Sequence, residues 1–286
     1  EILAIRGDLD EALELLERAS ATTEDPWTLA AARGNVADIL RARGELDEAL
    51  RIRLACEYDP HFAVNSSSIT PLPHQLDAVY RYMLKSPLVR FLLADDPGAG
   101  KTIMAGLLIR ERLLRGTLRR CLIIAPGGLV DQWQAELEER FDLQFEQLQT
   151  SETAPFSGSD RLVLARLDQL ARNKKLIQKL RNDKRWDLIV VDEAHKLSAS
   201  ANGRKIERTA RYRLGEQLRE LTDDLLLMTA TPHNGIEGCF QLSIALLAPD
   251  RFCGPYQEPF PKQQNHDLLL RRVKEDLVRF DGTKLF

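Results

Sequence analysis

Short, fully apolar runs that alternate with stretches of helical periodicity constrain the fold of this chain more than any other feature. Five such runs follow residue 73 of the sequence: Val89–Ala94, Cys121–Ala125, Leu162–Ala165, Leu188–Asp192 and Leu225–Thr229. Runs of this kind suit parallel strands that are buried on both faces. Helical periodicity covers the stretches Thr102–Leu114, Val130–Arg140, Leu167–Leu180 and Arg211–Leu221. The alternation predicts an α/β fold with a parallel sheet and helices on both of its faces.

A glycine-rich stretch, "DDPGAGKT", leads from the first apolar run into a helix. It departs from the usual phosphate-loop signature, since Asp95 stands where the first glycine is expected. Gly98 and Gly100 still allow backbone N–H groups to turn inward around phosphate oxygens. Lys101 can reach the β- and γ-phosphates, and the Thr102 hydroxyl can bind Mg²⁺. The alternative is a chance glycine turn, but the strand before it and the helix after it favour a nucleotide site.

Two acidic residues end a later apolar run, in the sequence "WDLIVVDEAH". Nucleotide hydrolysis requires one carboxylate that holds Mg²⁺ and a second that orients and deprotonates the attacking water. We expect Asp192 to serve the metal and Glu193 to act as the base. Without the phosphate loop, such a pair would usually be a solvated turn.

A third strand end carries hydroxyl groups, in "LLLMTATPHNG". Thr229 and Thr231 at this position can bond the carboxylates or report the γ-phosphate. By itself the pattern would be an ordinary strand terminus, because threonine favours strands.

Together these motifs give the chain a clear resemblance. Residues 70–286 resemble the first RecA-like lobe of superfamily-two helicases and translocases, in the Swi/Snf-like branch, which commonly has Asp at the first loop glycine. The motifs in chain order are "LPHQLDAVY", "DDPGAGKT", "LIIAPGGLVDQWQAEL", "DEAH" and "TATP". Near the end, "DLLLRRVKEDLV" resembles the segment that leads to the second lobe in RapA-type and DISARM-type helicases.

The resemblance implies ATP and Mg²⁺ as cofactors and assigns further residues to the nucleotide. Gln75 would contact the adenine edge. The loop residues that would surround the phosphates are Asp96, Pro97, Gly98, Ala99, Gly100, Lys101 and Thr102. Pro97 is a departure, because Met is frequent there in this branch.

The resemblance also implies a second lobe, which supplies an arginine finger worth about 10³–10⁵ in rate. No such lobe follows in this sequence, so we expect the chain alone to bind ATP and hydrolyse it weakly. The expected track is DNA, in double-stranded form. Candidate DNA contacts are Gly127, Gly128 and Gln132, and the basic residues Arg204 and Lys205. For the basic stretch, a solvated loop is an equally good interpretation.

The first 60 residues carry a different pattern. "GDLDEALELLERA" begins at Gly7 and "GELDEALRIRLA" at Gly44, 37 positions later, close to the ~34-residue period of tetratricopeptide repeats. We therefore expect a small all-α helical-repeat segment over 1–60, a linker over 61–72, and the RecA-like lobe over 73–286. The repeats would dock a protein partner or, equally, pack as a plain helical extension.

The composition limits the remaining classes. The net charge is −3, so any nucleic-acid surface must be local rather than spread over the chain. The four cysteines show no metal-ligand spacing, which indicates reduced thiols. No apolar run approaches ~18 residues, so no membrane span is expected, and we expect a cytoplasmic, nucleoid-associated protein.

Two other functions stay open. The lobe could be a nucleotide-dependent scaffold whose repeats dock a partner. It could also be the motor subunit of a restriction or phage-defence complex.

Overall fold

The computed structural model describes residues 61–148, 161–202, 205–230, 237–249 and 268–286. The chain divides into two compact units, Glu1–Thr70 and Pro71–Phe286. Of the first unit only residues 61–70 are described, and they include the short helix α5 (Phe62–Asn65). The predicted helical repeats of residues 1–60 lie outside the described residues. Every feature discussed below belongs to the second unit.

The second unit is built on a parallel sheet in the order β3-β4-β2-β5-β8-β1-β9. All five predicted apolar runs form strands of this sheet, within about one residue of the expected bounds. The strands are β1 (Arg90–Leu93), β2 (Arg120–Ala125), β3 (Glu146–Gln147), β4 (Arg161–Arg166), β5 (Leu188–Val191), β8 (Leu225–Met228) and β9 (Leu269–Leu270).

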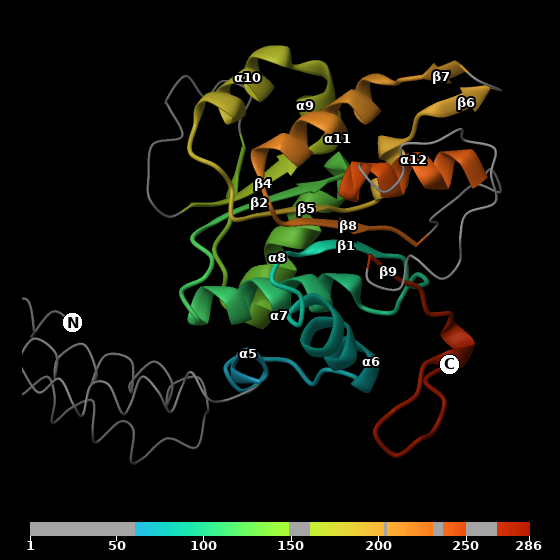
Figure 1. Cartoon of the computed structure of the whole chain (residues 1–286). Helices are drawn as coiled ribbons and strands as arrows, with labels where there is room; N and C mark the ends of the chain where they lie inside the picture. Colours follow the sequence, from blue (N-terminus) through green and yellow to red (C-terminus); the bar gives the residue numbers. More distant parts are fainter. Residues whose placement is uncertain (1–60, 149–160, 203–204, 231–236, 250–267) are drawn as a thin grey trace, which may run out of the picture. The chain divides into compact units, whose positions relative to one another are not determined.

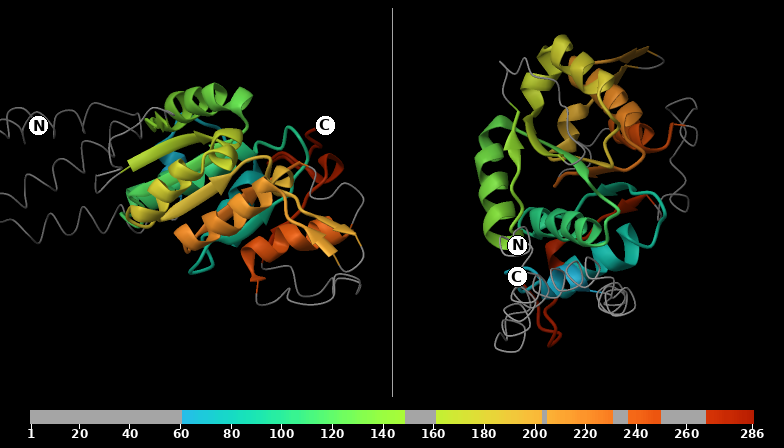
Figure 2. Two further views of the ribbon diagram at one scale, coloured as in Figure 1. Left: turned by 90° about the horizontal axis from the view of Figure 1, so that it is seen from above. Right: turned by 90° about the vertical axis from the view of Figure 1, so that its left-hand side faces the viewer.

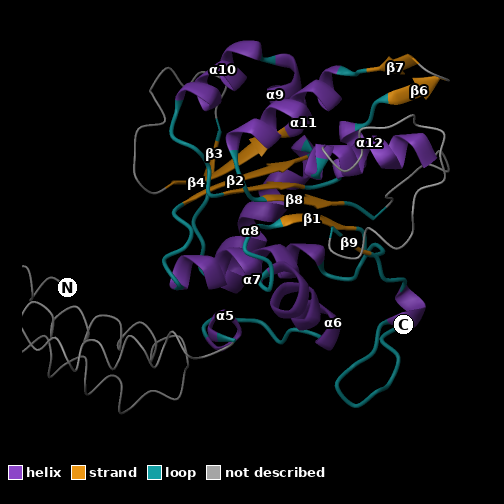
Figure 3. Ribbon diagram, viewed as in Figure 1, coloured by secondary structure: helices purple, strands orange, loops and turns teal. Residues whose placement is uncertain are grey.

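Helices cover both faces of the sheet, as the sequence predicts (Figures 1 and 3). One face carries α6 (Pro73–Leu76), which continues into a π-helical segment (Asp77–Met83), together with α7 (Lys101–Leu114) and α8 (Val130–Phe141). The other carries α9 (Leu167–Arg172), α10 (Lys174–Asn182), α11 (Ala210–Leu221) and α12 (Glu237–Leu247). Two further views show the same layers (Figure 2).

The strand side chains alternate between two buried layers, because successive residues of a strand point to opposite faces. Leu92, Leu122 and Ile189 belong to the apolar cluster shared with α9 to α12. Their neighbours in sequence are also buried, and this alternation turns them toward α7 and α8. The central strands therefore have no polar face, which is why they appear in the sequence as continuous apolar runs.

The single helix expected over Leu167–Leu180 is wrong. Asn173 interrupts it, with φ −106° and ψ 88°, and divides it into α9 and α10. The side-chain oxygen of Asn173 accepts a hydrogen bond from the Leu176 N–H (3.1 Å), which caps the second helix. Apolar spacing persists across this break, so periodicity alone does not detect it.

Four short strands were not predicted. Strands β3 and β9 at the edges have two residues each. The antiparallel pair β6 (Ser200–Asn202) and β7 (Lys205–Glu207) forms a separate hairpin. None of these carries a long apolar run. Within the part of the chain that the structure describes, no helix is long and apolar enough to cross a membrane.

The contact between α7 and α8 yields a prediction for the Gly106→Ala variant. An added Cβ would lie 2.3 Å from Cε2 of Phe141, a ring with no exposed surface. Alanine favours helices by up to about 1 kcal/mol, but here the clash outweighs this gain. We expect a net loss of about 1–3 kcal/mol in the free energy of unfolding, measured by urea denaturation.

Gly128→Ala is the matched control. A Cβ at Gly128 meets no atom within 4 Å, so its effect should stay within about 0.5 kcal/mol. Equal stability of the two variants would contradict the packing described for Phe141.

Candidate nucleotide-binding site

Parallel strand pairing brings the sequence motifs together at one end of the sheet, where the strands reach their carboxyl ends. Strands β1, β8, β5 and β2 are consecutive neighbours, so their carboxyl ends emerge side by side (Figure 1). The Thr229 N–H donates to the Leu93 carbonyl (3.0 Å), and the Asp192 N–H donates to the Ile124 carbonyl (2.8 Å). The phosphate loop, Thr229 and Asp192 therefore lie in one row.

The phosphate loop has the backbone that its glycines permit. Gly98 has φ 87° and Gly100 has φ 80°, a left-handed conformation that is strained for other residues. Gly100 is also the N-cap residue of α7, so the helix begins directly at Lys101. The first-turn N–H groups and the positive end of the helix dipole are therefore available to an anion at the loop.

Lys101 bonds the loop itself. Its Nζ donates to the carbonyls of Asp95 (2.7 Å) and Asp96 (3.1 Å). Burial lowers the pKa of Lys101, and the charges of Asp95, Asp192 and Glu193 oppose that shift. The ammonium group is thus held beside the loop and within the field of the acidic pair, where a phosphate group could replace the two carbonyls.

Gln75 and His74 fix the other side of the loop. Gln75 Nε2 and His74 Nε2 both bond the Ala99 carbonyl, at 3.1 Å and 2.9 Å. Because a carbonyl can only accept, His74 donates from Nε2. Burial lowers the pKa of His74, which favours the neutral imidazole ring. A Cβ on Gly100 would lie 2.2 Å from Gln75 Nε2. The loop therefore needs glycine there for two reasons, its φ angle and the approach of Gln75.

The expected adenine contact of Gln75 stays a prediction. In the structure its Oε1 accepts from the Leu72 N–H (2.9 Å), while its Nε2 donates to Ala99. The carboxamide thus holds the loop backbone in place.

Asp192 is positioned by a residue from another element. Its Oδ2 accepts from the Trp133 indole N–H (2.9 Å), and its Oδ1 accepts from the Glu193 N–H (2.8 Å). Burial raises the pKa of Asp192, and the Trp133 bond opposes this by favouring the charged form. Each oxygen keeps a further lone pair for a ligand.

The residue after it adopts an uncommon backbone. Glu193 has φ 50° and ψ 46°, a left-handed conformation rare for residues other than glycine. Its Oε2 lies 3.1 Å from His195 Nδ1, which in turn lies 3.0 Å from Thr229 Oγ1. His195 therefore connects Glu193, the predicted base, to Thr229 at the end of the neighbouring strand. The motifs "DEAH" and "TATP", taken separately in the sequence, do not reveal this connection.

The donor set fits Mg²⁺ held together with a nucleotide. Among the described residues, no group of three or more His, Cys, Asp or Glu side chains could hold a metal ion. Mg²⁺ usually takes one or two protein oxygens and completes its shell with phosphates and water. Thr102 and Asp192 suit that mode.

The expected DNA contacts are described in part. Gly127 and Gly128 form an exposed 3-10 turn that begins α8, and exposed Gln132 bonds Glu136 (2.8 Å). Arg204 and Thr231 lie outside the described residues, as does the side chain of Lys205. In the same basic stretch, Arg208 and Arg211 pair with acids, Glu216 (3.5 Å) and Asp168 (2.7 Å).

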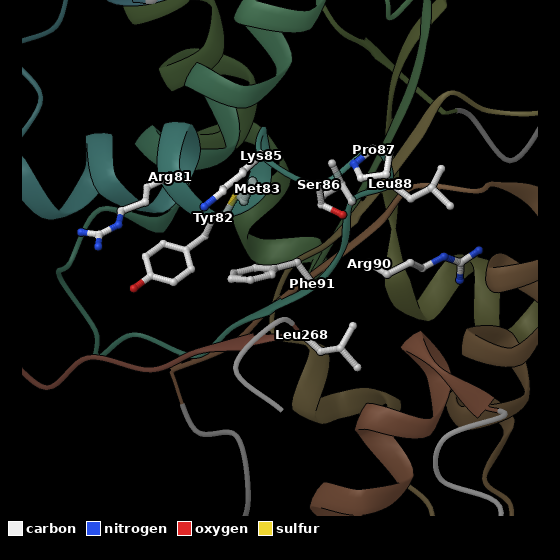
Figure 4. A pocket seen from close by; sticks show the side chains of 11 residues that line it. Arg81, Tyr82, Met83, Lys85, Ser86, Pro87, Leu88, Arg90, Phe91 and Leu268 are labelled. Carbon is white, nitrogen blue, oxygen red and sulfur yellow. The ribbon is translucent and has the colours of Figure 1, made fainter. Parts of the chain in front are cut away.

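A separate cavity of about 580 Å³ lies where β1 begins (Figure 4). Its lining includes the basic residues Arg81 and Lys85 and the apolar residues Leu88, Phe91 and Leu268. None of the predicted site residues lines it. The motifs lie at the opposite, carboxyl end of the strands, so this cavity is not part of the nucleotide site.

Three contributors to the site escape sequence reasoning. Trp133 is buried, as a packing residue is, but its indole N–H also bonds Asp192. His74 and Arg272 bond the phosphate loop and its surroundings from distant positions. The only sequence signal for His74 is its place beside Gln75. The only one for Arg272 is its place after the three leucines of "DLLLRRVKEDLV".

The chain is similar to known proteins in both sequence and fold. Residues 68–234 match the model of the family described as "Type III restriction enzyme, res subunit". The chain is 38% identical over 203 residues to the RNA polymerase-associated protein RapA of Yersinia enterocolitica, and similarly to RapA of Yersinia pseudotuberculosis. The aligned region covers 68% of this chain and 20% of those proteins, so the chain spans about a fifth of these relatives.

The fold resembles the Sulfolobus solfataricus SWI2/SNF2 ATPase core solved in complex with double-stranded DNA. The TM-score is 0.58 at 21% identity, over 73% of this chain and 46% of that one. A second structure, of the Sulfolobus solfataricus SWI2/SNF2 ATPase core domain, gives a TM-score of 0.57 at 22% identity. The described α/β unit therefore shares the fold of the SWI2/SNF2 ATPase core and is similar in sequence to part of RapA, and the chain belongs to the family described as "Type III restriction enzyme, res subunit".

Proposed function

We propose that this chain is the ATP-binding lobe of a motor that couples Mg-ATP hydrolysis to movement along duplex DNA. The observation that carries the proposal is the row of Lys101, Thr229 and Asp192 at the carboxyl ends of neighbouring strands. A helix dipole, a lysine and a partly buried carboxylate lie side by side at this end of the sheet, as phosphoryl transfer requires.

Each residue has a distinct role in this proposal. Loop N–H groups from Gly98 to Thr102 bind phosphate oxygens, and Lys101 leaves the carbonyls of Asp95 and Asp96 to bind the β- and γ-phosphates. Asp192 and Thr102 hold Mg²⁺, which neutralises charge on the phosphates when it is bound. Glu193 orients and deprotonates the attacking water, and its link through His195 to Thr229 connects hydrolysis to the next strand. Thr231 is proposed for the same coupling.

Duplex DNA is favoured by the placement of an exposed turn. Gly127 and Gly128 follow β2, two strands away from β8 on the same edge, so their N–H groups can meet a phosphate backbone. The SWI2/SNF2 ATPase core that shares the fold was solved in complex with double-stranded DNA. Arg204, Lys205 and Gln132 are proposed as further contacts.

Two other functions are distinguishable from this one. The family description favours a motor subunit of a restriction or defence complex, in which the same site serves a different biological purpose. A nucleotide-dependent scaffold would bind ATP without needing fast turnover. A protein partner through residues 1–60, and a second lobe of the same protein, belong to the proposal in each case.

The first test is the ATPase rate of the whole protein, including the expected second lobe, with duplex DNA, single-stranded DNA and RNA. We expect strong stimulation by duplex DNA, and weak turnover by residues 1–286 alone because the proposed arginine finger belongs to the second lobe. Preference for RNA or single strands would indicate a strand-separating helicase. Robust nucleic-acid-stimulated turnover by residues 1–286 alone would contradict the two-lobe proposal.

Glu193→Gln tests whether turnover is the function. In the whole protein we expect ATP binding to persist and hydrolysis to fall by about 10²–10⁴-fold, because the amide cannot accept the proton from water. Lys101→Ala should instead weaken nucleotide binding. Glu138→Gln, an exposed change on α8, is the control. Unchanged hydrolysis in Glu193→Gln would favour the scaffold.

Trp133→Phe tests the support of the metal ligand. The ring volume is largely kept, but Asp192 loses the donor that favours its charged form, so Mg²⁺-dependent ATPase activity should fall by about 10–100-fold. Higher Mg²⁺ concentrations should recover part of the loss.

Trp186→Phe is the matched control. Trp186 is equally buried, and its indole nitrogen has no hydrogen-bond partner among the described residues. Equal ATPase losses in both variants would show that the effect is one of packing, not of the bond to Asp192.

A further inference from the structure

Asp95, which replaces the first glycine of the phosphate-loop signature, bonds a residue far along the chain. Strand β9 pairs in parallel with β1, with Leu92 opposite Leu269 and Leu93 opposite Leu270. The chain that leaves β9 therefore emerges beside the phosphate loop, on the side away from β8 (Figure 1). This placement brings Arg272 to Asp95, across 177 positions of sequence.

The contact between the two side chains is extensive. Arg272 Nη2 donates to Asp95 Oδ2 (2.6 Å), and its Nε lies 3.1 Å and 3.3 Å from the two carboxylate oxygens. The Arg272 backbone N–H donates to Oδ1 (2.9 Å). Asp95 has no exposed surface, and 15% of the Arg272 side chain is exposed. A buried pair of this kind leaves an uncompensated charge when either partner is removed.

Further contacts connect the pair to Asp96, Ala99 and Lys101 of the loop. Arg272 Nη1 donates to the His74 carbonyl, and the His74 ring holds Ala99. The Asp96 N–H donates to the Arg272 carbonyl (3.2 Å), and Asp96 Oδ2 accepts from the Lys274 N–H (3.1 Å). The carbonyls of Asp95 and Asp96 are the same groups that hold Lys101.

We propose that Asp95 and Arg272 form the joint that fixes the phosphate loop to the segment following β9, with Arg272 as a positioning residue for nucleotide binding. A glycine at position 95 could hold the backbone turn but not the guanidinium. The joint also gives the loop a mechanical route to the chain that follows. When Lys101 exchanges the two carbonyls for phosphates, residues 95 and 96 change partners on one side while they still hold residues 272 and 274 on the other.

This proposal rests on the proposed nucleotide site, and its test separates the two. Binding of a fluorescent methylanthraniloyl derivative of ADP, with Mg²⁺, is measured by titration of the whole chain. The variants are Arg272→Gln, Arg272→Lys and Asp95→Asn, at a temperature where circular dichroism shows each to be folded. Arg271→Gln is the control, because this neighbouring arginine is exposed.

We expect about tenfold weaker nucleotide binding in Arg272→Gln and Asp95→Asn, as for loss of an outer partner of a ligand site. Arg272→Lys should recover only part of the affinity, because an ammonium group cannot form the forked contact. Arg271→Gln should bind as the wild type does. Wild-type affinity in the folded variants at Asp95 and Arg272 would overturn the joint.

Hydrogen exchange supplies a readout that a purely stabilising role would not move. In the wild-type chain, adding the nucleotide should change the exchange of the Arg272 and Lys274 amides, whose acceptors belong to Asp95 and Asp96. In Asp95→Asn at saturating nucleotide the response of the Arg272 amide should be lost, while the Lys274 amide, whose acceptor is Asp96, still responds and amides of β2 and β5 exchange as before. An unchanged response would overturn the proposed route. Failure of the wild type to bind the nucleotide would instead refute the proposed function, and the joint with it.

Discussion

The parallel pairing of β1 between β8 and β9 is the constraint on which the site depends. It sets the end of β1 beside Thr229 on one side and Arg272 on the other. Because all the central strands run in the same direction, the remaining motifs lie at the same carboxyl end of the sheet. A change of direction in one strand would carry its motif to the other end of the sheet.

The two ends of the sheet use their charged residues differently. At the amino end, Asp187 Oδ2 accepts from the backbone N–H groups of Arg119 (2.7 Å) and Arg120 (2.8 Å), and Asp224 holds the Val89 N–H (2.7 Å) and Arg112. These carboxylates secure strand ends. At the carboxyl end, Lys101 and Asp192 bond groups that a phosphate or a metal can replace or join.

Positioning at the site is shared among distant parts of the chain. Trp133 on α8 holds Asp192, His195 lies between Glu193 and Thr229, and Arg272 holds Asp95. Each of these contacts joins a residue of one motif to a residue of another element. The motifs therefore share more than a location at the carboxyl end of the sheet. Hydrogen bonds and ion pairs also link them to one another and to the surrounding elements.

The sequence by itself determined the strand positions and the places of the glycine-rich loop and of the acidic pair after their strands, because apolar runs, glycines and local motif spacing are properties of neighbouring residues. It did not detect the break at Asn173, since apolar spacing continues through it, or the two-residue edge strands, which carry too few residues for a pattern. Only the tertiary structure decided that Asp95 meets Arg272 and that Trp133 bonds Asp192. Such contacts depend on strand order and on the direction of side chains, which residues far apart in the chain acquire only when the sheet forms.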